Sequence, residues 1–186
     1  MAALTKKLNR SITIKILGLG GQGVVTTAAT LARAAFHQGY WSQSMPFFGV
    51  ERTGTPVEAY VRIADQSIRN RQKINRCDIL IINDYRLYQQ NDLGKQLTII
   101  NHSDLANYQP KTKLLTYDSR QISLDIFNQD LAIGLLGGLS AAWSLIDEDN
   151  WFKALSEQFA NPIIAQKNQQ AFLANRQLAI KLIKSA

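Results

Sequence analysis

The sequence of 186 residues has a single cysteine, only four prolines, and no apolar run long enough to cross a bilayer. One cysteine, Cys77, excludes an internal disulfide, and it excludes an iron–sulfur cluster or a four-cysteine zinc site held by this chain alone. The longest apolar stretch, residues 131–143, is shorter than the roughly 20 residues that a membrane-spanning helix needs. The basic N-terminus has no apolar segment behind it, so we predict no signal peptide there. We therefore predict a soluble, cytoplasmic protein without a membrane span.

No linker, repeat or biased tract divides the chain, so we predict one domain over residues 1–186. Hydrophobic residues make up 46% of the sequence and charged residues 19%, which is typical of a folded protein and not of a disordered one. A chain of this length buries roughly 70% of the surface that its unfolded form exposes. Residues 1–10 are expected to form a flexible N-terminal tail.

The chain is basic, with 21 Lys and Arg against 14 Asp and Glu and a net charge of +7. Such an excess is compatible with a nucleic acid, a phosphate-bearing ligand or an acidic protein partner. The densest basic stretch, residues 69–76, is interrupted by uncharged residues, and no nucleic-acid-binding motif accompanies it. We therefore predict no nucleic-acid binding, and we interpret this stretch as a solvated face or as a docking surface for an acidic partner.

The order of the hydrophobic patterns is that of an α/β domain. Residues 12–17 form a short β-branched run before a group of glycines, and residues 24–37 have helical spacing and end near Gly39. Short apolar runs at 78–83 and 96–101 are typical of parallel strands that are covered on both faces. Further elements are expected as strands at 40–44, 57–63 and 114–117, a loop at 45–56, and helices at 131–143, 147–159 and 162–184. We predict a Rossmann-like, doubly wound fold, with a mostly parallel sheet and helices on both faces.

The glycines between the first strand and the first helix predict an anion site. Residues 18–23, Gly-Leu-Gly-Gly-Gln-Gly, have the G-x-G-x-x-G spacing. In such a loop the first glycine permits a tight turn, the second lets a phosphate approach bare backbone, and the third lets the helix pack closely. The first amides of the helix then point at the anion. The predicted binding residues are Gly18, Gly20, Gly21, Gln22 and Gly23, and the alternative is a tight turn that binds nothing.

A nicotinamide dinucleotide is not the expected anion. Its site needs an Asp or Glu at the end of the second strand, about 20 residues beyond the glycines, to hold the ribose hydroxyls. Residues 40–44 contain no acid, and the next one, Glu51, lies well inside the following loop. No arginine cluster suited to a 2′-phosphate replaces it. The sequence thus disfavours NAD and NADP and favours another phosphorylated ligand.

Two segments together resemble a known family. Residues 18–25 (GLGGQGVV) and 45–57 (MPFFGVERTGTPV) resemble the gamma subunit of pyruvate and other 2-oxoacid:ferredoxin oxidoreductases. That family pairs a GxGGQGV loop with a later F-P-x-F-G-x-E-R-x-G-[AT]-P-V loop. The resemblance continues at residues 128–138 and 167–172, so it covers nearly the whole chain. Thr53 departs from it, because many relatives have a second basic residue there, and the loop is closer to the pyruvate-type branch.

The resemblance implies a subunit that has no activity alone and works within a larger enzyme. Such a complex decarboxylates a 2-oxoacid oxidatively, transfers the acyl group to coenzyme A and reduces ferredoxin. Thiamine diphosphate with Mg²⁺ and the iron–sulfur clusters are expected on partner chains, namely the alpha, beta and ferredoxin-like subunits. The gamma chain is expected to help bind coenzyme A and to deliver its thiol to the thiamine-bound intermediate.

Individual residues fit this role. The amides of residues 20–23 suit the pyrophosphate of coenzyme A, and the side chain of Gln22 is a further donor. Arg52 is expected to bind another phosphate oxygen or to form a salt bridge with a partner chain. Ser44, at the end of the second strand, is an additional ligand candidate. We predict no catalytic residue and no metal ligand in this chain.

Two other functions remain open at this point. The chain is alternatively a nucleotide-binding oxidoreductase or redox sensor that uses the same glycine loop, or a scaffold whose loop only packs tightly. Cys77 is interpreted as a small buried hydrophobe. Gly134 and Gly138 have the spacing that lets helices approach closely.

Overall fold

Six strands form one sheet, in which strand β1 is hydrogen-bonded on both sides. The computed structural model describes residues 7–8, 10–47, 54–88, 94–102 and 113–185. In chain order the strands are β1 (Ile12–Leu19), β2 (Trp41–Phe47), β3 (Pro56–Ala64), β4 (Ile79–Ile82), β5 (Leu97–Asn101) and β6 (Lys113–Tyr117). They lie in the order β2-β3-β1-β4-β5-β6. Strands β1, β4, β5 and β6 are parallel, whereas β3 is antiparallel to β1 and β2, so the sheet is mixed and mostly parallel.

The central strands form because their side chains are buried on both faces. On β1, Ile14 and Ile16 are buried beneath the helices and Leu17 is buried in the cluster on the other face, and all four residues of β4 are fully buried. Isoleucine is stiff at its branched Cβ and favours an extended backbone. The predicted strands at 12–17, 78–83 and 96–101 are confirmed as β1, β4 and β5, with small shifts at their ends.

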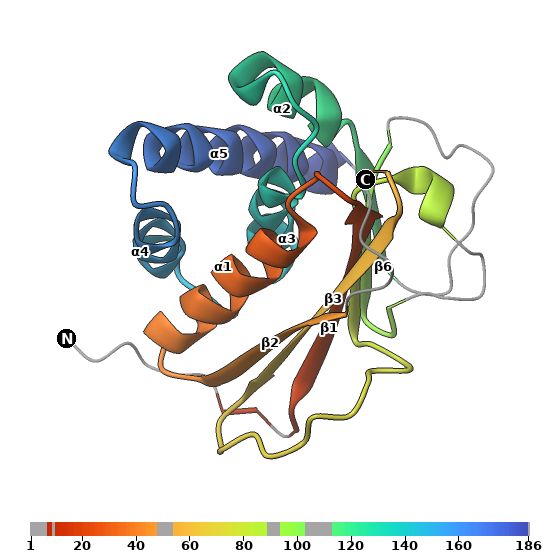
Figure 1. The fold of residues 1–186 in the computed structure, drawn as a ribbon, viewed down its shortest axis with the longest axis vertical. Helices are drawn as coiled ribbons and strands as arrows, with labels where there is room; N and C mark the ends of the chain where they lie inside the picture. The colour runs from red at the N-terminus through yellow and green to blue at the C-terminus, as the bar shows by residue number, and fades with distance from the viewer. Residues whose placement is uncertain (1–6, 9, 48–53, 89–93, 103–112, 186) are drawn as a thin grey trace.

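The α-helices gather on one face of the sheet. They are α1 (Val24–His37), α2 (Ser119–Phe127), α3 (Leu135–Ala142), α4 (Glu148–Gln158) and α5 (Pro162–Ser185). Figure 1 shows α1 and α3 next to the sheet, with α4 farther out against α1 and α5, and α2 on the other side of α5. None of the helices within the described ranges is long and apolar enough to cross a membrane.

The opposite face of the sheet is covered by shorter segments. A 3-10 helix, η1 (Tyr85–Leu87), follows β4, and Ile74 and Cys77 pack against Leu80 from the segment before it. The predicted α/β class with a mostly parallel sheet is confirmed, and Cys77 is buried as predicted. Helices are predicted on both faces, but they are distributed unequally. The described connection between β4 and β5 contains the 3-10 helix η1 and no α-helix.

Three boundaries differ from the sequence-based expectation. The loop predicted at 45–56 begins later, because β2 pairs with β3 as far as Phe47, and β3 already begins at Pro56. The helix predicted at 131–143 starts with a 3-10 turn, η2 (Ala132–Gly134), where the amide of Ala132 donates to the carbonyl of Gln22. Helix α2 was not predicted. Its start carries a capping signal, since the Asp118 side chain accepts from the amide of Gln121.

Asp78 fastens β1 to the beginning of β4. Its buried carboxylate accepts from the amide and hydroxyl of Thr13, each at 2.8 Å, and from Arg10 Nη2 at 2.6 Å. Arg10 belongs to the predicted tail, most of which lies outside the described residues. Burial alone raises the pKa of Asp78, but the hydrogen bonds from Arg10 and Thr13 outweigh it and hold that pKa below its ordinary value.

We predict that Asp78→Asn lowers the free energy of unfolding by about 2–3 kcal/mol at pH 7, because hydrogen bonds to a buried charge are lost. A carboxylate whose folded pKa is depressed stabilises the fold above its unfolded pKa of about 4, and this contribution disappears as pH falls through the folded value. Urea unfolding of both proteins at pH 7 and pH 3 measures the effect. The difference in the free energy of unfolding between wild type and Asp78→Asn should be smaller at pH 3 than at pH 7. An equal difference at both pH values would contradict the stabilising role of the Asp78 carboxylate.

Helices α3 and α5 approach each other through glycines. A Cβ atom at Gly137 of α3 would lie 2.1 Å from the carbonyl oxygen of Phe172, and one at Gly134, the last residue of η2 before α3, would lie 2.6 Å from Asn175 Nδ2. Close helix approach is therefore confirmed at Gly134. At Gly138 the space is filled by the ring of Tyr117 on β6, and the second close contact between the helices is at Gly137.

We predict that Gly137→Ala destabilises the protein by about 1–3 kcal/mol or more, because the backbone of α5 must move to admit the methyl group. Thermal or urea unfolding measures the loss. Gln170→Ala, on the exposed side of α5, is the control and should change stability by less than about 0.5 kcal/mol. Equal stabilities of the two variants would contradict the close packing.

Candidate functional site

The glycine loop, residues 18–23, turns the chain from β1 into α1 within a few residues. Gly21 has a φ of 93° and Gly23 a φ of 69°, a left-handed backbone that favours glycine. Gly23 is the N-cap of α1, and no side chain caps the helix there. The first backbone bond of the helix runs from Thr27 to the carbonyl of Gly23. The amides of the first turn therefore have no acceptor within the helix and point toward the positive end of the helix dipole, where an anion binds well.

Only part of the predicted set of loop amides is available to a ligand. The amide of Gly20 donates to the carbonyl of Thr55 at 2.8 Å, and that of Gln22 donates to Leu19 at 3.0 Å. Gly18 lies within β1, where a Cβ atom would be 2.6 Å from Val24 Cγ2. In the general motif the third glycine lets the helix pack closely against the strand. In this protein the first glycine, Gly18, has this role.

Gln22 holds the loop from inside. Its Oε1 accepts from the amide of Leu19 at 2.7 Å, and its Nε2 donates to Asp130 Oδ2 at 3.0 Å. Both ends of the side chain are therefore engaged within the protein. Gln22 Nε2 carries a second N–H, so the predicted hydrogen bond to a ligand is compatible with the bond to Asp130.

The structure does not bring Ser44 to the loop. Ser44 lies in the middle of β2, opposite Val61 of β3, which in turn lies opposite Ile14 of β1. The loop follows Leu19, so Ser44 sits about five residues, or roughly 16 Å, below it along the sheet. Arg52 lies outside the described residues.

Several polar residues missed in the sequence lie at the carboxyl ends of the parallel strands. Asn83 follows β4, and Asn101 ends β5; Asn101 Nδ2 donates to Asn83 Oδ1 at 3.4 Å. Asn101 Oδ1 accepts from the amides of Ser119 and Arg120 at the start of α2. The sequence contains a pattern that indicates these residues, because two apolar runs each end in Asn. Parallel strands of an open α/β sheet bind ligands at this edge.

Two carboxylates at this edge have different environments. The Arg86 guanidinium donates two hydrogen bonds to Asp84, at 2.6 and 2.8 Å, and holds the pKa of Asp84 below its ordinary value. Asp130 instead accepts from neutral side-chain amides; burial raises its pKa, although the hydrogen bond from Asn83 and the charge of Arg120 oppose the shift. Within the described residues, no three His, Cys, Asp or Glu side chains are grouped to hold a metal ion.

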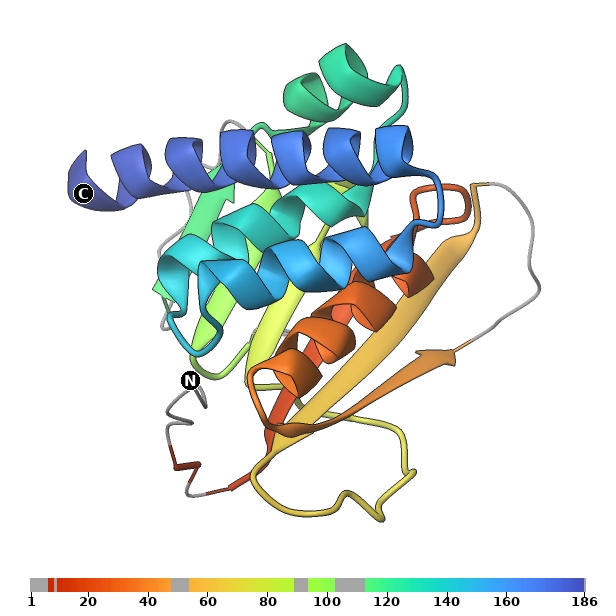
Figure 2. The same ribbon diagram turned by 90° about the vertical axis from the view of Figure 1, so that its left-hand side faces the viewer.

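A cleft of about 360 Å³ adjoins the glycine loop. Figure 2 shows the loop beside the start of α5, which forms the other side of this cleft. Gly23 and Thr26 line it near the start of α1, and Lys167 and Asn168 line it from α5. Asn168 is almost fully buried, and its Oδ1 has no hydrogen-bond partner among the described residues. The apolar walls are Phe127, Leu131, Ile133, Phe159 and Ile164. No acid in the described part of the chain lines the cleft, so it suits an anion with an apolar portion.

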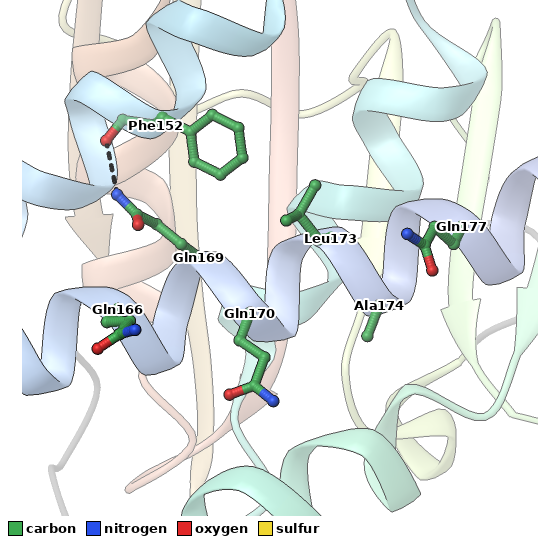
Figure 3. Close-up of a pocket in the computed structure, with 7 residues that line it drawn as sticks. All are labelled: Phe152, Gln166, Gln169, Gln170, Leu173, Ala174 and Gln177. Atoms are coloured by element: carbon green, nitrogen blue, oxygen red, sulfur yellow. Dashed lines mark hydrogen bonds between the residues drawn. The ribbon is translucent and has the colours of Figure 1, made fainter.

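A second, more open hollow lies on the outer side of α5 and is lined mainly by glutamines. Figure 3 shows Gln169 bonded to the backbone of Phe152, while Gln170 lies on the other side of the helix. Gln169 also donates to the hydroxyl of Ser156 at 2.9 Å. None of the described residues that line this hollow is a cation, which makes it a poor phosphate site.

The sheet also lacks the geometry of a dinucleotide site. Beside β1, where a Rossmann domain has a parallel second strand, lies the antiparallel strand β3. Pro56, at the start of β3, is the partner of Leu19 at the loop. In a dinucleotide site a carboxylate at the end of the second strand holds the ribose. In this protein the first residues of β3 lie at that place.

Comparison with known proteins identifies the family. The model of the family described as "Pyruvate ferredoxin/flavodoxin oxidoreductase" matches residues 13–178. The chain belongs to this family. It is 35% identical over 167 residues to pyruvate synthase subunit PorC of Methanothermobacter thermautotrophicus, covering 86% of this chain and 91% of the relative. It is 34% identical to the pyruvate/ketoisovalerate oxidoreductases common subunit gamma of Thermococcus kodakarensis, covering 86% and 92%.

Solved structures of this oxidoreductase family share the fold. The pyruvate oxidoreductase subunit PORC of Thermotoga maritima superposes with a TM-score of 0.76 at 21% identity, covering 91% of this chain and 97% of that one. A 2-oxoglutarate:ferredoxin oxidoreductase of Magnetococcus marinus, solved with 2-oxoglutarate, coenzyme A and succinyl-CoA bound, gives 0.74 at 18% identity. This chain covers 31% of that much longer one. The resemblance to the gamma-subunit family, drawn from residues 18–25 and 45–57, is confirmed.

Proposed function

We propose that this chain is the gamma subunit of a multi-subunit 2-oxoacid:ferredoxin oxidoreductase in the cytoplasm, and that it helps to bind coenzyme A. The observation that carries the proposal is the uncapped start of α1 after the glycine loop, next to a cleft that no described acid lines. The names of the relatives favour pyruvate as the 2-oxoacid. One distant structural neighbour was solved with coenzyme A bound, which favours this carrier.

The pyrophosphate of coenzyme A fits the outward-facing amides. We assign this contact to the amides of Gly21, Gly23 and the first turn of α1, which have no acceptor among the described residues, whereas those of Gly20 and Gln22 are bonded within the chain. Lys167 offers a charge across the cleft, and Arg52 is proposed as a further phosphate contact. Ser44 lies roughly 16 Å from the loop along the sheet, so it is not proposed as a contact of the same phosphates. The apolar walls of the cleft and the unpaired oxygen of Asn168 suit the remainder of the molecule, which has both methyl groups and amide N–H donors.

In this proposal the chain binds and orients, while partner chains perform the chemistry. Thiamine diphosphate with Mg²⁺ and iron–sulfur clusters, on the alpha, beta and ferredoxin-like subunits, would supply the carbon and electron steps. The single cysteine agrees with this division, because one thiolate cannot hold a cluster. The task of the described residues is to hold the phosphates so that the thiol reaches the acyl group.

The first test replaces Gly21 by leucine in the assembled complex. A Cβ atom at Gly21 meets nothing within 4 Å, so the side chain extends into the space proposed for the phosphates. We predict that the KM for coenzyme A rises by about tenfold or more, equivalent to about 1.4 kcal/mol, with a smaller change in kcat. Gly39→Leu is the matched control, because Gly39 has a similar φ of 97° at the far end of α1. Equal KM values in the two variants would favour a loop that serves only as a scaffold.

The second test reverses the charge of Lys167. Lys167→Glu places a negative charge in the cleft, so we predict a KM for coenzyme A raised by about fivefold at low salt and less at high salt. Lys181→Glu, an exposed lysine further along α5, is the control and should leave this KM unchanged. Steady-state kinetics of the complex at two ionic strengths measures both. The same change in the KM for coenzyme A in both variants would show that the cleft is not part of the binding site.

A further inference from the structure

We propose that Asp130 is a positioning residue that shapes the glycine loop through Gln22 and thereby sets the affinity of the loop for its phosphate ligand. This inference rests on the proposed function of the loop. Asp130 acts on the loop backbone through a side chain. Its Oδ2 accepts from Gln22 Nε2 at 3.0 Å, and the other end of the Gln22 side chain accepts from the amide of Leu19 at 2.7 Å. The amide side chain is thus held at both ends, across the base of the turn.

The turn that carries Asp130 is itself firmly held. Asn128 ends α2 in the left-handed conformation, with a φ of 57°. The buried hydroxyl of Ser123 donates to the carbonyl of Gln129 and accepts from the amide of Leu131, both at 2.8 Å. A second link to the loop runs beside the first, because the amide of Ala132 donates to the carbonyl of Gln22 at 2.9 Å. The position of Asp130 relative to Gln22 is therefore fixed on both sides.

Asp130 also joins the loop to the ends of the neighbouring strands. Its second oxygen accepts from Asn83 Nδ2 at 3.3 Å, and Asn83 accepts from Asn101. Asn101 in turn accepts from the first amides of α2. The result is one continuous chain of hydrogen bonds from Leu19 at the loop, through Gln22, Asp130 and the two asparagines, to the start of α2.

The chemistry of this chain requires an acceptor at position 130. The side chains of Gln22 and Asn83 both present N–H donors to it, so the residue between them must accept twice. An ionised carboxylate does this with charge-assisted bonds. An asparagine offers one oxygen, and its own N–H₂ group then meets a donor. Loss of the bond releases Gln22, and with it the constraint on the amide of Leu19.

The charges around Asp130 make this device sensitive to pH. From α2 it faces the cation Arg120 and the acid Asp118, and from the end of β4 it faces Asp84, which is paired with Arg86. Burial raises the pKa of Asp130, so its proton returns at a higher pH than that of an ordinary aspartate. A protonated Asp130 loses acceptor strength. The loop should therefore bind its ligand less well as pH falls through this raised value.

The experiment is a swap of donor and acceptor in the assembled enzyme. Asp130→Asn alone places two side-chain amides opposite each other at positions 22 and 130. Gln22→Glu alone places two carboxylates opposite each other at the same positions. Gln22→Glu combined with Asp130→Asn restores the bond between the two side chains with the roles exchanged. We expect each single variant to raise the KM for coenzyme A by about five- to tenfold, and the double variant to return within about threefold of wild type. Asp125→Asn, on the exposed side of α2, is the control and should not change it.

Two readouts separate positioning from a purely structural role. The KM for coenzyme A of the wild-type complex should rise toward acid pH, and this rise should be weaker in Asp130→Asn. Amide hydrogen exchange of residues 17–24 in the complex should become faster in both single variants and return to the wild-type rate in the double variant. Single variants with lower melting temperatures but wild-type KM and unchanged exchange of residues 17–24 would overturn the inference. Additive effects in the double variant would overturn it as well.

Failure of the proposed function has a different signature. If coenzyme A binds elsewhere, Gly21→Leu and all Asp130 variants leave its KM unchanged, while the exchange rates of residues 17–24 still follow the donor–acceptor swap. If Asp130 does not position the loop, Gly21→Leu still raises the KM, while the exchange rates of the Asp130 variants stay at the wild-type level. The exchange measurement thus tests the Asp130–Gln22 bond whatever the ligand is.

Discussion

The turn from β1 into α1 is the constraint on which the site depends. Gly21 and Gly23 adopt a left-handed backbone that other residues rarely tolerate, and this lets the helix begin without a capping side chain. Its first amides have no capping side chain, and we propose that they bind the ligand. At the same time the amides of Gly20 and Gln22 are bonded to Thr55 and Leu19, so the shape of the turn does not depend on the ligand.

The antiparallel strand β3 explains why a dinucleotide motif need not make a dinucleotide site. Its first residue pairs with Leu19, and the preceding Thr55 accepts from Gly20, so β3 braces the loop at the place where a Rossmann enzyme binds ribose. The absence of an acid at residues 40–44 is consistent with the position of the antiparallel strand β3 between β2 and β1. In this sheet β2 is an edge strand, separated from β1 by β3, and an acid at its end would not reach the loop.

What could be predicted from the sequence was mostly local. Helix α1 matches its predicted bounds, because an alanine-rich amphipathic segment lies between Gly23 and Gly39. Strand β4 was visible as an uninterrupted apolar run. The bond between Gln22 and Asp130 joins residues 108 positions apart and has no local signal. Helix α2 has a weakly apolar sequence, and only its capping residues Asp118 and Gln121 mark it. Ser44 was misplaced because β2 continues through Met45–Phe47, where pairing with β3 outweighs the presence of Pro46.

The two sets of hydrogen bonds at the loop have separate roles, and this bears on how such motifs should be interpreted. Bonds directed inward, from Gly20 to Thr55 and from Gln22 to Asp130, fix where the backbone lies. The amides of Gly21, Gly23 and the start of α1 have no acceptor among the described residues, and we propose that they bind the ligand. The G-x-G-x-x-G spacing includes one residue of each set, Gly20 and Gly23, and it does not determine the inward partners Thr55 and Asp130. Two proteins with the same spacing but different inward partners would hold those amides in different places, and on the proposed function this difference would change which phosphate ligand each protein prefers.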